Sequence, residues 1–400
     1  MSGGAPILRA YSLSPCIPSK ACTRASDECV EKKNALSFHA WIFHSRHSPC
    51  AKETSMKISS EASQRIKNMG LLCAFFVVSI HVSWPHEQPL SVGWFMHQAF
   101  AQGLSRIAVP FFFVVSGFFL ASHFNDDNWY LQEITKRVKT LLVPFAFWCV
   151  VAVILTTPLS IIADIIAHRP FGTSITFMHD MNWLRVPGLD LTDYPIHVPL
   201  WYVRCLFLFV LTAFVFKYGI AKFGYAWLVA AFVFNLLGNH IPNEIIRKFF
   251  GPGYSINGIF YFSVGIFLHQ FPQALTSRRY VVPCGCVGIC LLALKLVFAY
   301  NAWQFETCIG KMSLPFLLYF IWCSMTASKL PQWLTACSFP IFLMHTIALS
   351  YIGIAMKHLP MGTTSAAFVG FIGSNIVSMA IAVFLRRFLP RFANVIFGGR

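Results

Sequence analysis

The chain has 400 residues, of which 56% are hydrophobic and 12% are charged, whereas soluble domains contain about 25% charged residues. With a mean hydropathy of +0.61, this composition excludes a soluble globular protein and indicates a protein that crosses the membrane several times. The net charge of +16 does not indicate nucleic-acid binding, because no basic face with interleaved aromatic residues lies outside the apolar segments.

Residues 1–55 do not share this apolar pattern. They are polar, rich in Ser, Lys and Cys, and lack an apolar run of signal-peptide length. We interpret them as a disordered cytoplasmic tail or as an over-extended start before Met56, and residues 56–400 as the transmembrane domain. The cysteines and histidines of the first segment match no zinc spacing, and the cysteines elsewhere show no pairing pattern. We therefore predict neither a metal site nor a set of structural disulfides.

Ten apolar runs follow residue 68, and each is expected to form a transmembrane helix. About 20 apolar residues per helix are needed to cross the hydrocarbon core, and an open sheet would leave its backbone polar groups unsatisfied in lipid. The predicted fold class is therefore an all-α polytopic membrane protein, a bundle of about ten helices. The runs lie near residues 69–85, 104–123, 141–163, 199–216, 225–238, 256–271, 281–299, 313–328, 338–356 and 367–388.

The basic residues predict the orientation of this bundle. Lys and Arg are concentrated in the loops on the side of the segment that precedes residue 69, which the positive-inside rule assigns to the cytoplasm. With an even number of spans, both termini are then cytoplasmic. The long loop near 164–198 lies on the opposite side.

Five ionisable side chains lie in five different apolar runs: His81, Arg106, Arg204, Lys295 and His345. A charged side chain costs roughly 2.5–3.5 kcal/mol at the centre of a membrane helix, so a chain that keeps such groups is expected to use them. If they face the interior of the bundle, they line one polar cavity. Two alternatives stay open: the three basic side chains could extend to the membrane interface, and the histidines could be core residues bonded to carbonyl groups.

Five segments carry motifs that are more specific together than alone. They are Asn68 to His81, Arg106-Ile-Ala-Val-Pro-Phe-Phe-Phe-Val-Val-Ser116-Gly117, the basic loop Lys136-Arg137-Val-Lys139 before Pro144, Pro199-Leu-Trp201-Tyr202-Val-Arg204, and Ser338-Phe-Pro-Ile-Phe-Leu-Met-His345. The residues of these segments and the order of the segments resemble those of the membrane-bound acyltransferase 3 family, over about residues 65–390. One position departs from the family pattern: Gly70 stands where the family has an arginine, and Lys67 and Arg65 are the nearest basic residues.

The resemblance implies roles for the residues in these segments. His81 is the expected catalytic base or nucleophile, and Arg106 is expected to stabilise the oxyanion or to position an anionic glycan or a lipid phosphate. The residues expected at the substrate are Arg204, Trp201, Tyr202, His345 and Ser116. Those expected at the acyl donor are Lys67, Arg65, Lys136, Arg137 and Lys139, because the phosphates of CoA would meet the basic inner loops.

The resemblance therefore implies a multi-pass enzyme of the bacterial inner membrane, an O-acyltransferase. Acetyl-CoA is the favoured donor, a glycan or glycolipid is the expected acceptor, membrane lipid surrounds the chain, and no metal or nucleic acid takes part. A homo-oligomer is one of the assembly states that the sequence leaves open. A transporter or flippase of an anionic or lipid-linked substrate is the alternative, although no inverted repeat is visible. A purely structural scaffold would give no reason for buried cations.

Overall fold

Helices make up the regular structure of the described chain. The computed structural model describes residues 58–170, 172–175, 183–270, 278–357 and 359–399, and within these ranges it contains no strand. Six helices there are long and apolar enough to cross a membrane, or seven if a bent pair counts as one span. The all-helical membrane fold is thus confirmed, whereas the count of about ten spans and the side of the termini stay predictions. The expected tail at residues 1–55 lies outside the described residues.

The first described helix, α2 (Ser60–His81), begins at a well-formed N-cap. The Ser59 side chain accepts a hydrogen bond from the Ala62 N–H at 3.1 Å, which satisfies one of the N–H groups that a helix leaves unpaired at its start. The first turns of α2 are polar and its remainder is apolar. For this reason α2 carries His81 at its apolar end without being one of the six long apolar helices.

The next span, Val92–Ala121, is broken instead of being one regular helix. It consists of α3 (Val92–Phe95), the π-helical η1 (Met96–Ala101), the 3-10 helix η2 (Leu104–Ile107) and α4 (Ala108–Ala121). Pro110 lies in the first turn of α4, where its missing N–H costs little. The break places Arg106 in η2, immediately before the regular part of the span.

The remaining helices follow in chain order. They are α5 (Trp129–Arg137), η3 (Val138–Leu142), α6 (Val143–Ile166), η4 (Trp183–Arg185), α8 (Leu200–Leu211), α9 (Ala213–Phe223), α10 (Tyr225–Leu237), η5 (Gly238–His240), α11 (Glu244–Lys248), η6 (Phe249–Gly253), α12 (Ile256–Gln270), α13 (Val281–Tyr300), α14 (Glu306–Ser324), α15 (Gln332–Thr335), α16 (Ser338–Met356), α17 (Thr363–Phe388) and α18 (Pro390–Ile396). Every predicted apolar run falls on one or more of these helices.

Two features explain why fewer helices than runs qualify as spans. α10 has 13 residues and α12 has 15, which is less than a straight crossing of the hydrocarbon core requires. α8 and α9 are bent by 64° relative to each other, so together they form either a broken span or a re-entrant segment.

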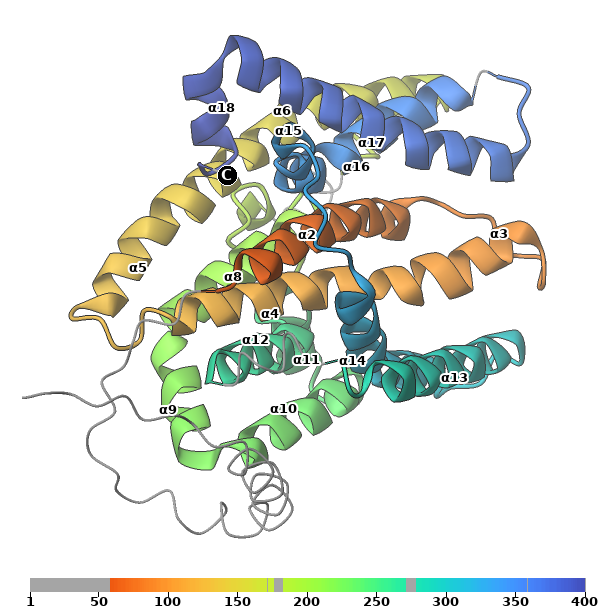
Figure 1. Ribbon diagram of the computed structural model, residues 1–400. Helices are drawn as coiled ribbons and strands as arrows, with labels where there is room; N and C mark the ends of the chain where they lie inside the picture. The colour runs from red at the N-terminus through yellow and green to blue at the C-terminus, as the bar shows by residue number, and fades with distance from the viewer. Residues whose placement is uncertain (1–57, 171, 176–182, 271–277, 358, 400) are drawn as a thin grey trace, which may run out of the picture. The chain divides into compact units, whose positions relative to one another are not determined.

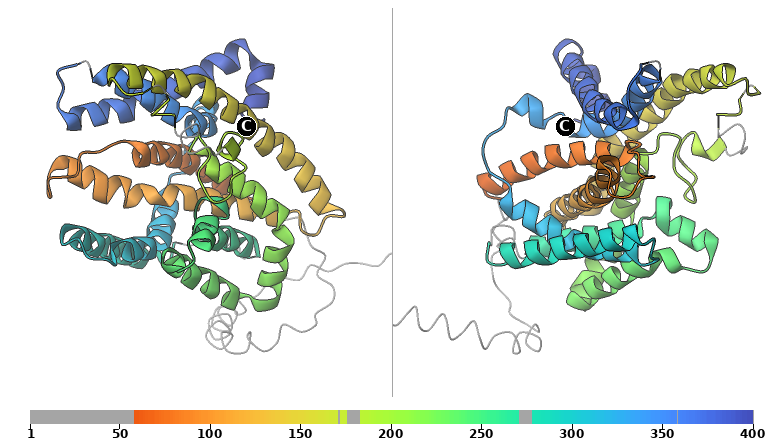
Figure 2. Two further views of the ribbon diagram at one scale, coloured as in Figure 1. Left: turned by 180° about the vertical axis from the view of Figure 1, so that it is seen from behind. Right: turned by 90° about the vertical axis from the view of Figure 1, so that its right-hand side faces the viewer.

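The helices from Ser60 onwards are arranged around the pair α2 and α4. This pair lies between a group that contains α6, α16 and α17 and a group that contains α10, α12, α13 and α14, as Figure 1 and Figure 2 show. α2 packs against α16 on one side and against α4 on the other, and α4 packs in turn against α12. The central position of α2 therefore brings its C-terminal residue, His81, next to His345 of α16.

Two glycines allow the close approach of α4 and α12. A Cβ atom on Gly117 would lie 2.2 Å from the carbonyl oxygen of Phe262, and one on Gly265 would lie 2.0 Å from that of Val114. Neither position can hold a larger side chain without moving a backbone. Small residues at such crossings let membrane helices pack through their backbones, so this contact fixes the position of α4.

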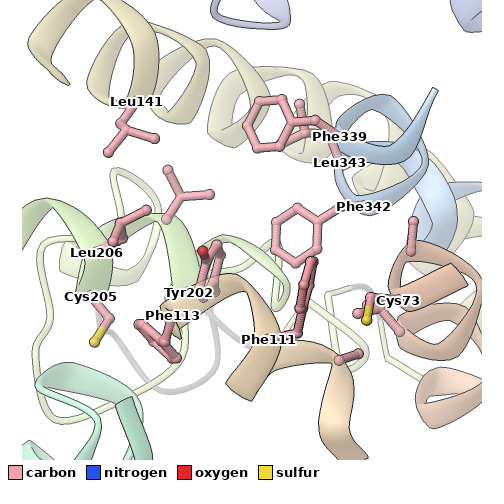
Figure 3. Packing of buried hydrophobic residues seen from close by; sticks show 14 of the residues in the cluster. Cys73, Phe111, Phe113, Leu141, Tyr202, Cys205, Leu206, Phe339, Phe342 and Leu343 are labelled. Carbon is pink, nitrogen blue, oxygen red and sulfur yellow. The ribbon is translucent and has the colours of Figure 1, made fainter. Parts of the chain in front are cut away.

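Aromatic side chains fill the space between α4, α8 and α16. The ring of Phe113 lies 4.8 Å from that of Tyr202, and the ring of Tyr202 lies 5.5 Å from that of Phe342. Figure 3 shows Phe342 extending from α16 into the gap toward Phe111 and Tyr202. Two of these buried rings, Tyr202 and Phe342, line the basic cavity that the next section describes.

Candidate active site

Among the cavities of the bundle, one is lined by hydroxyl groups, and we call it the hydroxyl cavity. It has a volume of about 460 Å³ and lies at the end of α2, between α6, α16 and the segments that contain Ser174 and His197. Its polar lining consists of Ser83, Thr156, Thr157, Ser160, Ser174, Thr346 and Ser350 together with His81 and His197. A volume of this size falls in the range of small-molecule sites.

Another cavity, the basic cavity, has a volume of about 730 Å³. Its aromatic lining is Phe112, Phe119, Tyr202, Phe339 and Phe342, and its polar lining is Gln64, Lys67, Ser116, His123, Lys136, Arg137, Gln332, Thr335 and Ser338. Two of the predicted substrate residues, Ser116 and Tyr202, and three of the predicted donor residues, Lys67, Lys136 and Arg137, thus lie on the same cavity.

The basic cavity carries an excess of positive charge. Glu133 is buried, and its carboxylate accepts a hydrogen bond from Arg137 Nε at 2.6 Å and lies 3.6 Å from Lys136 Nζ. One carboxylate therefore faces two cations. Lys67 is exposed and forms no ion pair with a described residue. Two uncompensated positive charges together with hydroxyl and amide donors suit an anionic group such as a phosphate.

A thin wall separates the two cavities on α16. Phe342 lines the basic cavity and Thr346 lines the hydroxyl cavity, and four residues of helix correspond to about 6 Å along the axis. His345 lies between these two positions and is completely buried. Its ring is 6.3 Å from the ring of Phe342 and 5.0 Å from the ring of His81.

The hydrogen bonds of His345 define its tautomer. Nδ1 lies 3.0 Å from the carbonyl oxygen of Ile341 and 2.9 Å from that of Phe342, and carbonyl oxygens only accept, so Nδ1 carries the proton. Nε2 is then unprotonated and can only accept a hydrogen bond, and it is buried without a hydrogen-bond partner. The ring nearest to it in this region is His81, whose own nitrogens make no hydrogen bond to a described residue.

His197 completes a group of three imidazoles at the hydroxyl cavity. Its Nε2–H donates to the carbonyl oxygen of Leu343 at 2.5 Å, and its Nδ1 accepts from Thr346 Oγ1 at 3.3 Å. Burial lowers the pKa of His197 to about 4, so the ring is neutral near pH 7 and both of its nitrogens are used. His81 is thus the member of the group whose ring is available to a ligand.

Arg106 lies near His81 but lines neither cavity. Ser105, the residue before Arg106, is hydrogen-bonded through Oγ to Ser79 Oγ at 2.8 Å, two residues before His81. The Arg106 guanidinium donates to Gln102 Oε1 through Nε at 2.9 Å and also through Nη2. The segments that carry the predicted pair of imidazole and guanidinium, α2 and η2, are therefore in contact. The role of Arg106 at an oxyanion stays a prediction.

Arg204 occupies a different kind of site from the one predicted. It is buried, and its guanidinium donates to the carbonyl oxygens of Gly188, Asp190, Asp193 and Pro252. These bonds hold the segment that precedes α8 against η6. Trp201 lies beside it among the aromatic rings between α4, α8 and α16, where its ring is 6.5 Å from that of Phe113. Both residues therefore support this packing and line neither cavity.

Two predicted donor residues also lie away from the basic cavity. Arg65 is buried and pairs with Glu61 one turn earlier on α2, and Lys139 lies on an exposed surface that also includes Leu131 and Gln132. Gly70, which replaces the arginine of the family pattern, has no atom within 4 Å of the position of a Cβ. The open space shows that a side chain would fit there.

Sequence reasoning did not identify the hydroxyl cavity. The usable signal was the spacing of Thr156 and Ser160 on one apolar run, and of Thr346 and Ser350 on another, since residues four apart lie on the same face of a helix. The polar residues of α15 and of the start of α16 at the basic cavity, such as Gln332 and Ser338, were also missed.

The comparison with known families decides the class of protein. A family model described as an acyltransferase domain (Acyl_transf_3) matches residues 66–383. The chain belongs to the acyltransferase 3 family. Acyltransferase 3 proteins transfer acyl groups other than aminoacyl groups, and the match extends from α2 into α17, through the helices that form both cavities. Neither a curated protein nor a solved structure matches the chain.

Proposed function

We propose that the protein is an O-acyltransferase of a bacterial inner membrane that moves an acetyl group from acetyl-CoA to a hydroxyl group of a surface polysaccharide or a lipid-linked glycan. The observation that carries this proposal is the pair of cavities with different chemistry, one basic and one lined by hydroxyl groups, on either side of His345 and next to His81. An acyl transfer between a charged donor and a sugar needs two such sites.

The basic cavity is the proposed donor site. Lys67, Lys136 and Arg137 offer positive charge to the phosphates of CoA, and Arg137 presents donors in a planar fork that matches phosphate oxygens. The pantetheine arm would extend from these residues toward Phe342, along the aromatic lining. For the reaction, the thioester would pass the wall at Phe342 and His345, which requires these side chains to move, and would reach the His81 ring.

The hydroxyl cavity is the proposed acceptor site, with His81 as the base. The acceptor hydroxyl gives its proton to the His81 ring, and its oxygen forms a bond to the carbonyl carbon of the thioester. The C–S bond then breaks, and the CoA thiolate takes up the proton from His81. We assign to Arg106 the stabilisation of the negative charge that develops on the carbonyl oxygen.

The proposal is tested by replacing His81. The His81→Ala protein, reconstituted in lipid vesicles with labelled acetyl-CoA and a crude glycolipid extract, should transfer label at least about 100-fold more slowly than the wild type, because general-base catalysis contributes at least this factor. The matched control is His269→Ala, since His269 is a partly buried histidine of α12 that lines neither cavity.

The fate of the label separates the proposed reaction from its alternatives. Label in an ester of the glycan supports O-acylation, whereas label that stays on CoA in the wild type would indicate a transporter. Transfer by His81→Ala at the wild-type rate would contradict the assigned role of His81.

A further inference from the structure

Most hydroxyl groups that line the hydroxyl cavity can accept a hydrogen bond from a ligand but cannot donate one. Thr156 Oγ1 donates to the carbonyl oxygen of Ala152 at 2.7 Å, Ser160 Oγ to that of Thr156 at 3.3 Å, and Ser350 Oγ to that of Thr346 at 2.9 Å. These protons are therefore committed to the helix backbone. The hydroxyl oxygens keep lone pairs that a ligand can use.

Two further hydroxyl protons of the lining are also committed. Thr346 Oγ1 donates to His197 Nδ1 at 3.3 Å. Nδ1 is the acceptor because Nε2 of the same ring donates to the Leu343 carbonyl oxygen. Ser174 Oγ donates to Asp164 Oδ1 at 2.5 Å. Only the Ser83 and Thr157 hydroxyls have no hydrogen-bond partner within the described residues.

No charged side chain of the described residues lines this cavity. The carboxylate of Asp164 does not line the cavity, because it is 1% exposed, accepts from the Ser174 N–H at 2.9 Å and pairs with Arg169 at 3.4 Å. The described lining contains no lysine or arginine. The hydroxyl cavity is therefore electrically neutral over its described part, in contrast to the basic cavity.

This lining discriminates between classes of ligand. A carboxylate or phosphate needs donors or cations to replace its water, and most donors here are committed. A cation would need carboxylates, and an apolar chain would leave the hydroxyl oxygens and the ring of His81 unpaired. A ligand with several hydroxyl groups and no charge satisfies the acceptors and brings no charge that must be desolvated.

We propose that the hydroxyl cavity binds an uncharged sugar unit and selects against acidic sugars. The inference rests on the proposed function, because it names the class of acceptor that His81 serves. In this site the sugar hydroxyl groups donate hydrogen bonds, and the hydroxyl oxygens of Thr156, Ser160 and Ser350 accept them. The positive charge of Arg106 then acts on the reacting carbonyl group and not on an anionic acceptor.

Three probes with one ring test the inference through binding alone. Methyl β-glucoside, methyl β-glucuronamide and methyl β-glucuronate differ at C6, and the last two have nearly the same shape but differ in charge at pH 7. Their Kd values are measured by saturation-transfer NMR with the full chain in lipid nanodiscs, in the absence of acetyl-CoA. The glucoside and the amide should bind with similar Kd values, and the acid at least 10-fold more weakly.

Matched variants locate the binding. Ser160→Ala combined with Ser350→Ala removes two acceptors of the cavity and should weaken both neutral probes at least 5-fold. The control is Ser313→Ala combined with Ser374→Ala, which removes two serines that also donate to carbonyl oxygens of their own helices but line neither cavity. Ser350→Arg, which adds a cation to the lining, should tighten binding of the acid at least 10-fold.

Equal binding of the acid and the amide, or no binding of either neutral probe, would overturn the inference. Unchanged neutral binding in the Ser160 and Ser350 double variant would overturn it as well. These outcomes differ from a failure of the proposed function. A protein that binds the neutral probes as expected but never transfers acetyl to them or to a glycan would keep the neutral sugar site and lose the O-acyltransferase assignment.

Discussion

At the scale of single residues, the contact between His81 and His345 explains why two histidines are kept in apolar helices. Their rings are 5.0 Å apart, and the proton on His345 Nδ1 is fixed by two carbonyl oxygens, which leaves Nε2 as an unpartnered acceptor. When His81 takes a proton from an acceptor hydroxyl, its second N–H gains a nearby acceptor in Nε2. In the proposed reaction, His345 would therefore act as a positioning residue that orients His81.

This arrangement predicts a graded response to substitution of His345. His345→Leu should lower kcat by about 10-fold or more, as is found when the partner that orients a functional histidine is removed, with little change in KM for acetyl-CoA. His345→Gln keeps an oxygen acceptor and should recover part of kcat. Steady-state kinetics on equal amounts of folded protein measure this split. A Gln variant that is as slow as the Leu variant would argue for a role in packing alone.

His197 gives the stability of the protein a specific pH dependence. Burial lowers its pKa to about 4 in the folded state, against an ordinary value of 6.5, so between these values the unfolded chain binds the proton and the folded chain does not. The contribution of neutral His197 is fully present above pH 6.5 and is lost as pH falls to about 4.

The thermal midpoint of the wild type in detergent should therefore fall as the pH is lowered from 7 to 4.5. The fall should be smaller in His197→Gln, whose amide can still donate to the Leu343 carbonyl but does not titrate. Parallel Tm curves for the two proteins would show that His197 does not couple stability to pH.

At the scale of helices, composition predicted where the helices lie but not where they break. Each apolar run forms helix because lipid leaves the backbone no other partner. The break before α4 and the bend between α8 and α9 depend on packing between segments that are distant in the sequence, such as the four carbonyl oxygens that Arg204 holds. A residue pattern within one run carries no information about these partners.

The crossing of α4 and α12 is expected to be the most sensitive of the helix contacts. Gly265→Ala would place a methyl group 2.0 Å from the Val114 carbonyl oxygen and should lower the free energy of unfolding by about 1–3 kcal/mol, as other overpacking substitutions do. In Gly353→Ala, where a Cβ meets no atom within 4 Å, stability should be unchanged or higher by up to about 1 kcal/mol. Thermal unfolding in detergent compares the two. Equal stabilities would refute the close backbone contact.

At the scale of the whole molecule, the motifs of the family contain several residues that line the basic cavity but, apart from His81, none that lines the hydroxyl cavity. Lys136 and Arg137 lie in the basic loop that resembles the acyltransferase 3 family, and they line one cavity together with Lys67, which precedes the first motif. Their role at the acyl donor stays a prediction. The hydroxyl cavity is assembled from α6, α16 and two loop segments, and its serines and threonines carry no motif. The spacing of Thr156 and Ser160, and of Thr346 and Ser350, puts each pair on one helix face, but the sequence alone does not show that the fold brings the two faces together.

The central claim is that donor and acceptor occupy different cavities on either side of the wall at Phe342 and His345. The most direct test is an experimental structure of the protein with CoA bound in a lipid nanodisc. The account predicts CoA phosphates within hydrogen-bond distance of Lys67, Lys136 and Arg137, with the thiol end directed toward Phe342. A CoA molecule seated among the hydroxyl groups beside Thr156 and Ser350 would contradict it.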